Sequence, residues 1–147
     1  SEFLGPSTDL FEFENRGVNM ATDSLWGEIP ETPLIRPPVL VLKEQGELLE
    51  QLTKGLLNCR IGREQSDSDT VLRFSIVAPA LNNYRYVLLT VVHGVELFPA
   101  DLIDEAEHIR RPCNGEVEFL EALRGVFQSE RTKRVIAGLL AQIQLGS

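Results

Sequence analysis

The pattern of apolar and polar residues in 70–98 predicts a β-hairpin at the centre of a sheet. In the first half of this stretch the two kinds of residue alternate, as they do in a strand with one buried face. In the second half, residues 84–92, nearly every position from Val87 onward is apolar, which is typical of a strand covered on both faces. A breaker-rich segment, 79–83, separates the halves. We therefore expect 84–92 to be the central strand.

A helical period precedes the hairpin, in residues 39–57. Its apolar residues fall on one stripe and its charged residues on the opposite side. The stripe consists of Leu48, Leu49, Leu52 and Leu56. We expect this stripe to pack on the sheet, and Gly55, which costs about 1 kcal/mol of helix propensity relative to Ala, to mark the point where the helix frays.

The segments between this helix and the C-terminal region are read as strands and turns. Residues 58–64 predict a first strand, and 66–69 predict the turn into the hairpin. Residues 95–104 predict a fourth strand, with a short helix over 101–109 as the alternative. A loop is expected at 110–115, because it combines arginines with Pro, Asn and Gly.

Two short helices are predicted to close the chain as a helical hairpin, about 115–127 and 129–144. Asn114 and Ser129 are the residues expected to cap them. The whole order predicts an α+β fold in which the helices pack on one face of an antiparallel sheet. Its parts are a four-stranded meander (about 58–104), an N-terminal helix (about 39–57) and a C-terminal helical hairpin (about 115–144), within one domain spanning 39–144.

The first nineteen residues are interpreted as an addition to the native chain. Met20 is the only methionine, and residues 16–19 can be back-translated to a purine-rich AGGGGAG string just before its codon, the pattern of a bacterial ribosome-binding site. We therefore expect 1–19 to be vector and leader sequence, and a bacterial gene to begin at Met20. The proline-rich residues 20–38 predict an extended arm, whose apolar side chains pack either on their own domain or on a second copy.

Composition narrows the classes of partner. The formal net charge is −8, which disfavours binding to nucleic acid or to an anionic membrane and suits a basic protein partner or solubility alone. The two cysteines, Cys59 and Cys113, form no CxxC pair and are expected to be reduced in a cytoplasmic protein. Neither a membrane span nor a signal peptide is recognisable in the sequence.

Reactive residues are few. His93, Glu96, Asp101 and His108 could bind a metal or perform acid–base chemistry, but their spacing matches no metal signature, and a solvated loop with an acidic edge is the simpler interpretation. Cys113 follows two arginines, which would lower its pKa in an exposed loop. No cofactor-binding motif is present.

The side chains best suited to recognition lie at the predicted hairpin tip and in the arm. They are Trp26, Asn82, Asn83, Tyr84, Arg85 and Tyr86. Aromatic residues and arginine are enriched at the hot spots of protein interfaces, and they also stack on unpaired bases. The alternative is that the tyrosines only cover the edge of the core.

These observations predict a small acidic bacterial protein that acts as a non-enzymatic protein–protein interaction module of the toxin-neutralising, accessory or self-associating type, with a homodimer possible. Two alternatives stay open. One is a metal-dependent or hydrolytic enzyme that uses His93, Glu96, Asp101 and His108. The other is a single-strand nucleic-acid binder that uses the tyrosine cluster, defined as Tyr84, Arg85 and Tyr86, together with the basic residues where the two C-terminal helices join, Arg124, Arg131, Lys133 and Arg134.

Overall fold

The computed structural model describes residues 23–31 and 35–146. The chain divides into two compact units, residues 1–34 and 35–147, and each is described by itself. Residues 23–31 contain neither helix nor strand, and the backbone N–H of Trp26 donates to Ser24 Oγ at 3.3 Å. The predicted addition at 1–19 lies outside the described residues.

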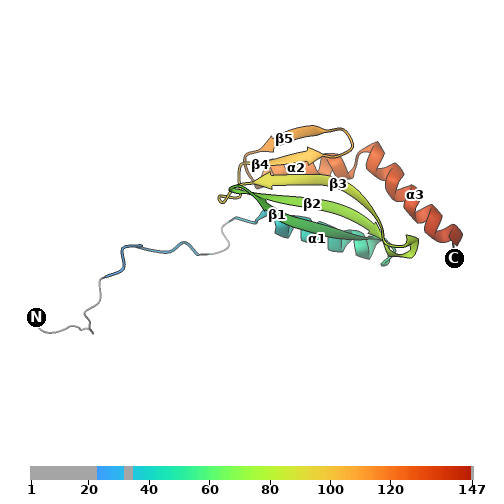
Figure 1. Ribbon diagram of the computed structural model, residues 1–147, viewed down its shortest axis with the longest axis horizontal. Helices are drawn as coiled ribbons and strands as arrows, with labels where there is room; N and C mark the ends of the chain where they lie inside the picture. The colour runs from blue at the N-terminus through green and yellow to red at the C-terminus, as the bar shows by residue number, and fades with distance from the viewer. Residues whose placement is uncertain (1–22, 32–34, 147) are drawn as a thin grey trace, which may run out of the picture. The chain divides into compact units, whose positions relative to one another are not determined.

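The second unit has an α+β fold, which confirms the predicted class (Figure 1). Its described elements are a single antiparallel sheet, three α-helices and one 3₁₀ helix. In chain order they are α1 (Pro38–Leu52), β1 (Asn58–Ser66), β2 (Asp69–Ala78), η1 (Pro79–Leu81), β3 (Tyr84–His93), β4 (Ala100–Asp104), β5 (Ile109–Cys113), α2 (Glu116–Phe127) and α3 (Glu130–Gly146).

The sheet is a meander in the order β1-β2-β3-β4-β5, so β3 is central, as predicted. The prediction of four strands is wrong, because the expected loop at 110–115 contains most of a fifth strand, β5; the predicted fourth strand over 95–104 is the shorter β4. A tight turn joins these strands where a helix was the alternative: Asp104 Oδ1 accepts the backbone N–H groups of Ala106 and Glu107 at 2.9 and 3.2 Å. Pro112 is compatible with β5 because β5 is an edge strand.

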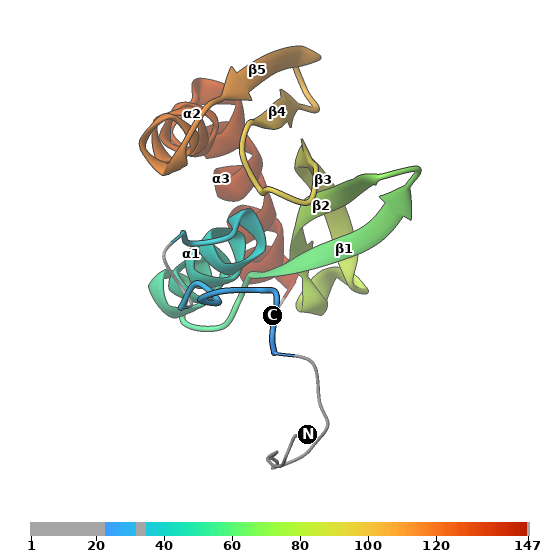
Figure 2. The ribbon, with the colours of Figure 1, turned by 90° about the vertical axis from the view of Figure 1, so that its left-hand side faces the viewer.

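The helices lie on one side of the sheet (Figure 2). Helix α1 ends at Leu52, earlier than predicted, because Lys54 and Gly55 adopt positive φ angles of 54° and 83°. Ser129 is the cap that the sequence predicts for α3, since its Oγ accepts the N–H of Thr132 at 3.2 Å. Asn114 is not a cap; the N-cap of α2 is Gly115.

The face of α1 that packs on the sheet differs from the predicted leucine stripe. Val41, Leu42 and Gly46 are its buried residues, together with Pro38. Gly46 lies so close to β1 that an added Cβ would be 2.8 Å from Cys59 Cβ. Leu48 and Leu52 are instead 46% and 81% exposed. The expectation that the leucine stripe packs on the sheet is therefore wrong for three of its four residues, because Leu56, which follows the helix, is exposed as well and only Leu49 packs against the core.

Candidate functional site

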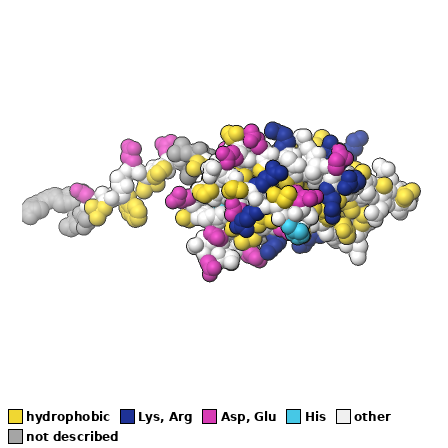
Figure 3. Space-filling view, turned by 90° about the horizontal axis from the view of Figure 1, so that it is seen from above, with side chains coloured by type: hydrophobic (Ala, Val, Ile, Leu, Met, Phe, Trp, Pro, Cys, Tyr) yellow, Lys and Arg dark blue, Asp and Glu magenta, His cyan; other side chains and the backbone are white. Residues whose placement is uncertain are grey.

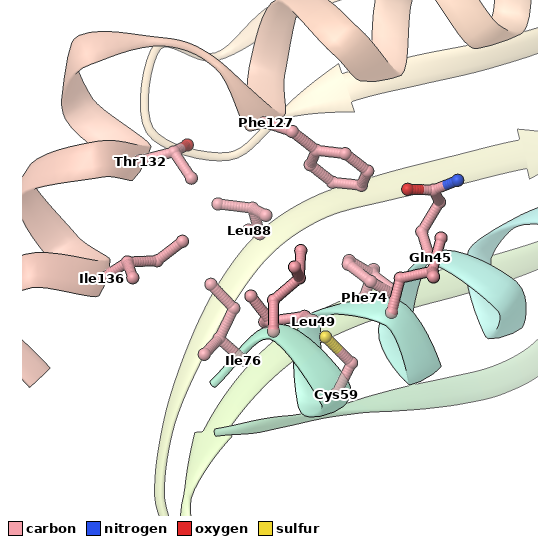
Figure 4. Close-up of a pocket in the computed structure, with 11 residues that line it drawn as sticks. Gln45, Leu49, Cys59, Phe74, Ile76, Leu88, Phe127, Thr132 and Ile136 are labelled. Carbon is pink, nitrogen blue, oxygen red and sulfur yellow. The ribbon is translucent and has the colours of Figure 1, made fainter. Parts of the chain in front are cut away.

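An apolar groove of about 200 Å³ lies between α1 and the α2–α3 hairpin, above the middle of the sheet (Figure 4). Leu48, Leu49 and Leu52 of α1 form one wall, and Phe127 and Ile136 belong to the other. The floor is made by side chains of the sheet. They are Cys59, Phe74, Ile76 and Leu88.

A β-bulge between β2 and β3 brings Leu88 into the floor of the groove. The register between β2 and β3 shifts at Phe74 and Ser75, so that Phe74 pairs with Leu89, Ser75 pairs with Val87, and Leu88 has no direct partner. Such a bulge bends the strand and redirects the extra side chain. Leu88 accordingly lines the groove, and the ring of Phe74 packs on Phe127 with centroids 5.8 Å apart.

Arg36, which does not line the groove, links α1 to the start of α2. Its guanidinium forms an ion pair with Glu44 of α1 and another with Glu116 of α2, the latter at 3.3 Å. Toward the C-terminal end of α1 the rim carries the exposed side chains of Leu48 and Leu52. The groove therefore presents apolar side chains to solvent along its α1 rim.

The side chains that line the groove are apolar or uncharged. None of the described residues that line it is Asp, Glu, Lys, Arg or His. Burial, and after it the carboxylate of Glu50, raises the pKa of the Cys59 thiol to about 12, so this thiol is neutral at physiological pH. The hydroxyl of Thr132 donates to the carbonyl of Val126 at 2.7 Å. The groove thus offers burial of apolar groups and no nucleophile.

The structure separates the members of the tyrosine cluster predicted from the sequence. Tyr84 and Tyr86 line a cleft of about 430 Å³ beside α3, opposite Arg134 and Gln142. Arg85 belongs to the other face of the sheet, because successive strand residues alternate. Arg134 is one of the basic residues expected to act with Tyr84 in the nucleic-acid alternative. Gln142 was not among the candidates, since no local pattern signals that α3 returns to this strand.

The other residues predicted for recognition, Asn82, Asn83 and Trp26, differ in their local structure. Asn82 and Asn83 adopt left-handed φ angles of 61° and 57°, which Asn tolerates better than most residues, so the turn itself accounts for them. Trp26 lies in the first unit and is 81% exposed. Its role in recognition stays a prediction.

The residues of the enzyme alternative are not gathered at one point. His93 and Asp101 lie on opposite faces of the sheet, because His93 pairs with Ala100 and Asp101 pairs with the preceding residue of β3. The Nδ1–H of His93 donates to the carbonyl of Gly94 at 2.7 Å, and Asp101 forms an ion pair with Arg110 at 2.8 Å. His108 is in the turn at the other end of β4. Within 23–31 and 35–146, no group of three or more His, Cys, Asp and Glu could hold a metal ion.

Cys113 also differs from its prediction as an exposed, reactive thiol. It is in β5 and only 1% exposed. Burial raises the pKa of its thiol, the carboxylates of Glu118 and Asp101 raise it further, and the opposing effect of Arg111 is smaller. Burial therefore outweighs the neighbouring positive charge.

No protein family, curated protein or solved structure matches this chain. No helix among the described residues is both long enough and apolar enough to cross a membrane. On the face shown in Figure 3, acidic and basic side chains are interspersed, whereas sequence-independent binding of nucleic acid needs a basic surface.

Proposed function

We propose that this protein is a non-enzymatic binding module that holds an amphipathic helix of a partner protein in the groove between α1 and the α2–α3 hairpin. The observation that carries the proposal is the exposure of Leu48 and Leu52 on the rim of an apolar groove. Apolar side chains at i and i+4 of a helix lie on the same face, so these two leucines present one continuous ridge.

The size of the groove favours side chains of a protein over a complete small molecule. Sites for drug-sized ligands typically enclose about 300–1,000 Å³. The volume here is about 200 Å³. A cavity of about 150 Å³ holds one benzene-sized group, so this groove accommodates one or two apolar side chains. A helix that places anchors at i and i+3 or i+4 meets that requirement.

The partner helix is expected to be basic on its solvent side. The chain has a formal net charge of −8, which attracts positively charged partners at long range. The groove itself carries no charge among its described lining residues, so the charges steer association while the leucines supply contact. This division corresponds to an apolar interface centre with a polar rim.

A display library of amphipathic, basic helical peptides provides the test. Peptides selected on the wild-type protein should bind at least tenfold more weakly to a Leu48→Glu, Leu52→Glu double variant, because each glutamate places a charge where an apolar anchor packs. The fold should survive, since both leucines are substantially exposed. Circular dichroism and the thermal midpoint would verify this.

The matched control is Tyr84→Ala, at the separate cleft beside α3. It should leave peptide affinity within about twofold of wild type. A library that yields no binder contradicts the proposal. Peptides that bind the leucine variant normally but lose affinity for Tyr84→Ala would place recognition in the tyrosine cleft instead.

A further inference from the structure

Strand β1 leaves one side of the sheet open. It is nine residues long, contains no proline, and has β2 as its one neighbour in the described sheet. Among residues 23–31 and 35–146, no strand pairs with the backbone groups on its other side. Long edge strands of this kind are templates for pairing with a further strand, and proteins commonly shorten, charge or interrupt them to prevent it.

The charges of β1 are arranged in a way that complements a second copy of the same strand. The strand reads NCRIGREQS over Asn58–Ser66. A two-fold axis perpendicular to the sheet pairs identical strands antiparallel and keeps each residue on its own face. When the axis passes beside Gly62, Arg60 of each copy lies opposite Glu64 of the other. Directly opposed residues of unlike charge stabilise an antiparallel pair.

The neighbouring registers lack this complementarity. An axis beside Ile61 places Arg60 opposite Gly62, and an axis beside Arg63 places the two Arg63 side chains opposite each other. Like charges in directly opposed positions are destabilising. The sequence of β1 therefore selects the register centred on Gly62, where the absence of a side chain leaves the axis uncrowded.

In the monomer, the side chains of Arg60 and Glu64 are both accessible to a second copy of the chain. Arg60 is exposed and forms no ion pair among the described residues. Glu64 contacts Arg73 at 3.1 Å, and its side chain remains 58% exposed. A carboxylate has two oxygens and can accept from two guanidinium groups. Glu64 can therefore keep Arg73 and also receive Arg60 of a second copy.

The helix-covered side of the same edge adds a second complementary contact. A cleft of about 480 Å³ runs between α1 and β1, and Glu47, Glu50, Ile61 and Arg63 are among its lining residues. In the register centred on Gly62, Arg63 of the second copy lies opposite Ile61, beside this cleft. Neither glutamate has an ion pair among the described residues. They are suitably placed acceptors for that guanidinium.

We propose that the protein forms a homodimer through antiparallel pairing of β1 with β1 of a second copy, centred on Gly62, so that the two sheets become one. The apolar groove lies on the other side of α1 and stays open in each copy. This inference is independent of the proposed partner helix, and either can fail alone.

Sedimentation equilibrium of the full chain, over a series of concentrations, gives the test. Wild type should show a reversible monomer–dimer equilibrium. Arg60→Glu and Glu64→Arg should each weaken dimerisation roughly thirtyfold, because each turns two attractive cross-strand pairs into repulsive ones. A mixture of the two variants should restore the dimer, since position 60 of each chain then faces a side chain of opposite charge at position 64 of the unlike chain.

The mixture keeps the test valid if a single variant is impaired for another reason, because a misfolded chain would not recover on mixing. Arg110→Glu, on the opposite edge strand, is the matched control and should dimerise like wild type. A wild-type protein that is monomeric at the highest concentration overturns the proposal. So does a dimer that neither charge reversal weakens.

Discussion

The two sides of helix α1 face surfaces of different chemistry, the apolar groove and the cleft beside β1, although one cysteine lines both. Toward the α2–α3 hairpin, α1 presents leucines to an uncharged groove. Toward the edge of the sheet it presents Glu47 and Glu50 to a cleft that also contains Arg60 and Arg63. Cys59 lines both. This difference is the basis for proposing an apolar anchor of another protein on one side and a second copy of the chain on the other.

The contrast depends on how tightly α1 is held against β1. Gly46 is the contact point, and a Cβ there would lie 2.8 Å from Cys59 Cβ, closer than two such atoms pack without movement. If α1 moves away from β1, the groove and the cleft both change shape. The largest effect is therefore expected from a single methyl group at this position.

Gly46→Ala should reduce the free energy of unfolding by about 1–3 kcal/mol through overpacking, although Ala favours a helix more than Gly does. Gly138→Ala is the matched control. It is also within a helix, an added Cβ meets nothing within 4 Å, and it should raise the free energy of unfolding by up to about 1 kcal/mol. Urea unfolding measures both. Equal effects of the two substitutions would contradict the close contact.

A smaller and more local effect is expected at Cys59. Its pKa is raised to about 12 from an ordinary 9.0, so its thiolate is scarce at neutral pH. Alkylation of Cys59 by iodoacetamide at pH 8 should be at least about a hundredfold slower in the folded protein than in urea. The raised pKa stabilises the fold fully below pH 9.0, and this contribution is lost as pH rises towards 12.

Peptide mapping by mass spectrometry measures alkylation separately for Cys59 and Cys113. Fast labelling of Cys59 in the folded protein would show that the floor shared by the two surfaces is open to water. The two sides of α1 would then not be separated by a buried boundary.

Local signals in the sequence are sufficient for most elements of this fold. Alternation and breakers locate the central hairpin, and Ser129 marks the start of the last helix. Strand β5 could not be recognised, because its arginines and Pro112 resemble a loop and are compatible with a strand only at an edge. The leucine stripe was a wrong prediction of the packed face of α1, which consists of Val41, Leu42 and Gly46 with Pro38, because a helical period does not show which part of an apolar face a sheet covers.

The sites depend more strongly on contacts between distant segments. The groove joins α1 to residues of the helical hairpin, such as Phe127 and Ile136, that follow it by more than 70 positions in the chain. The cleft beside α3 likewise unites Tyr84 and Tyr86 with Arg134. No spacing motif encodes such meetings, so sequence patterns could suggest residue types suited to recognition but not the surface they form.

The most direct test of the central claim is an amide chemical-shift map of the ¹⁵N-labelled protein during titration with a peptide selected from the helical library. We expect the largest shifts to fall on Leu48, Leu52, Phe127 and Ile136, and we expect the Leu48→Glu, Leu52→Glu variant to abolish them. Shifts confined to Tyr84 and Tyr86, or to the edge formed by β1, would contradict the central claim.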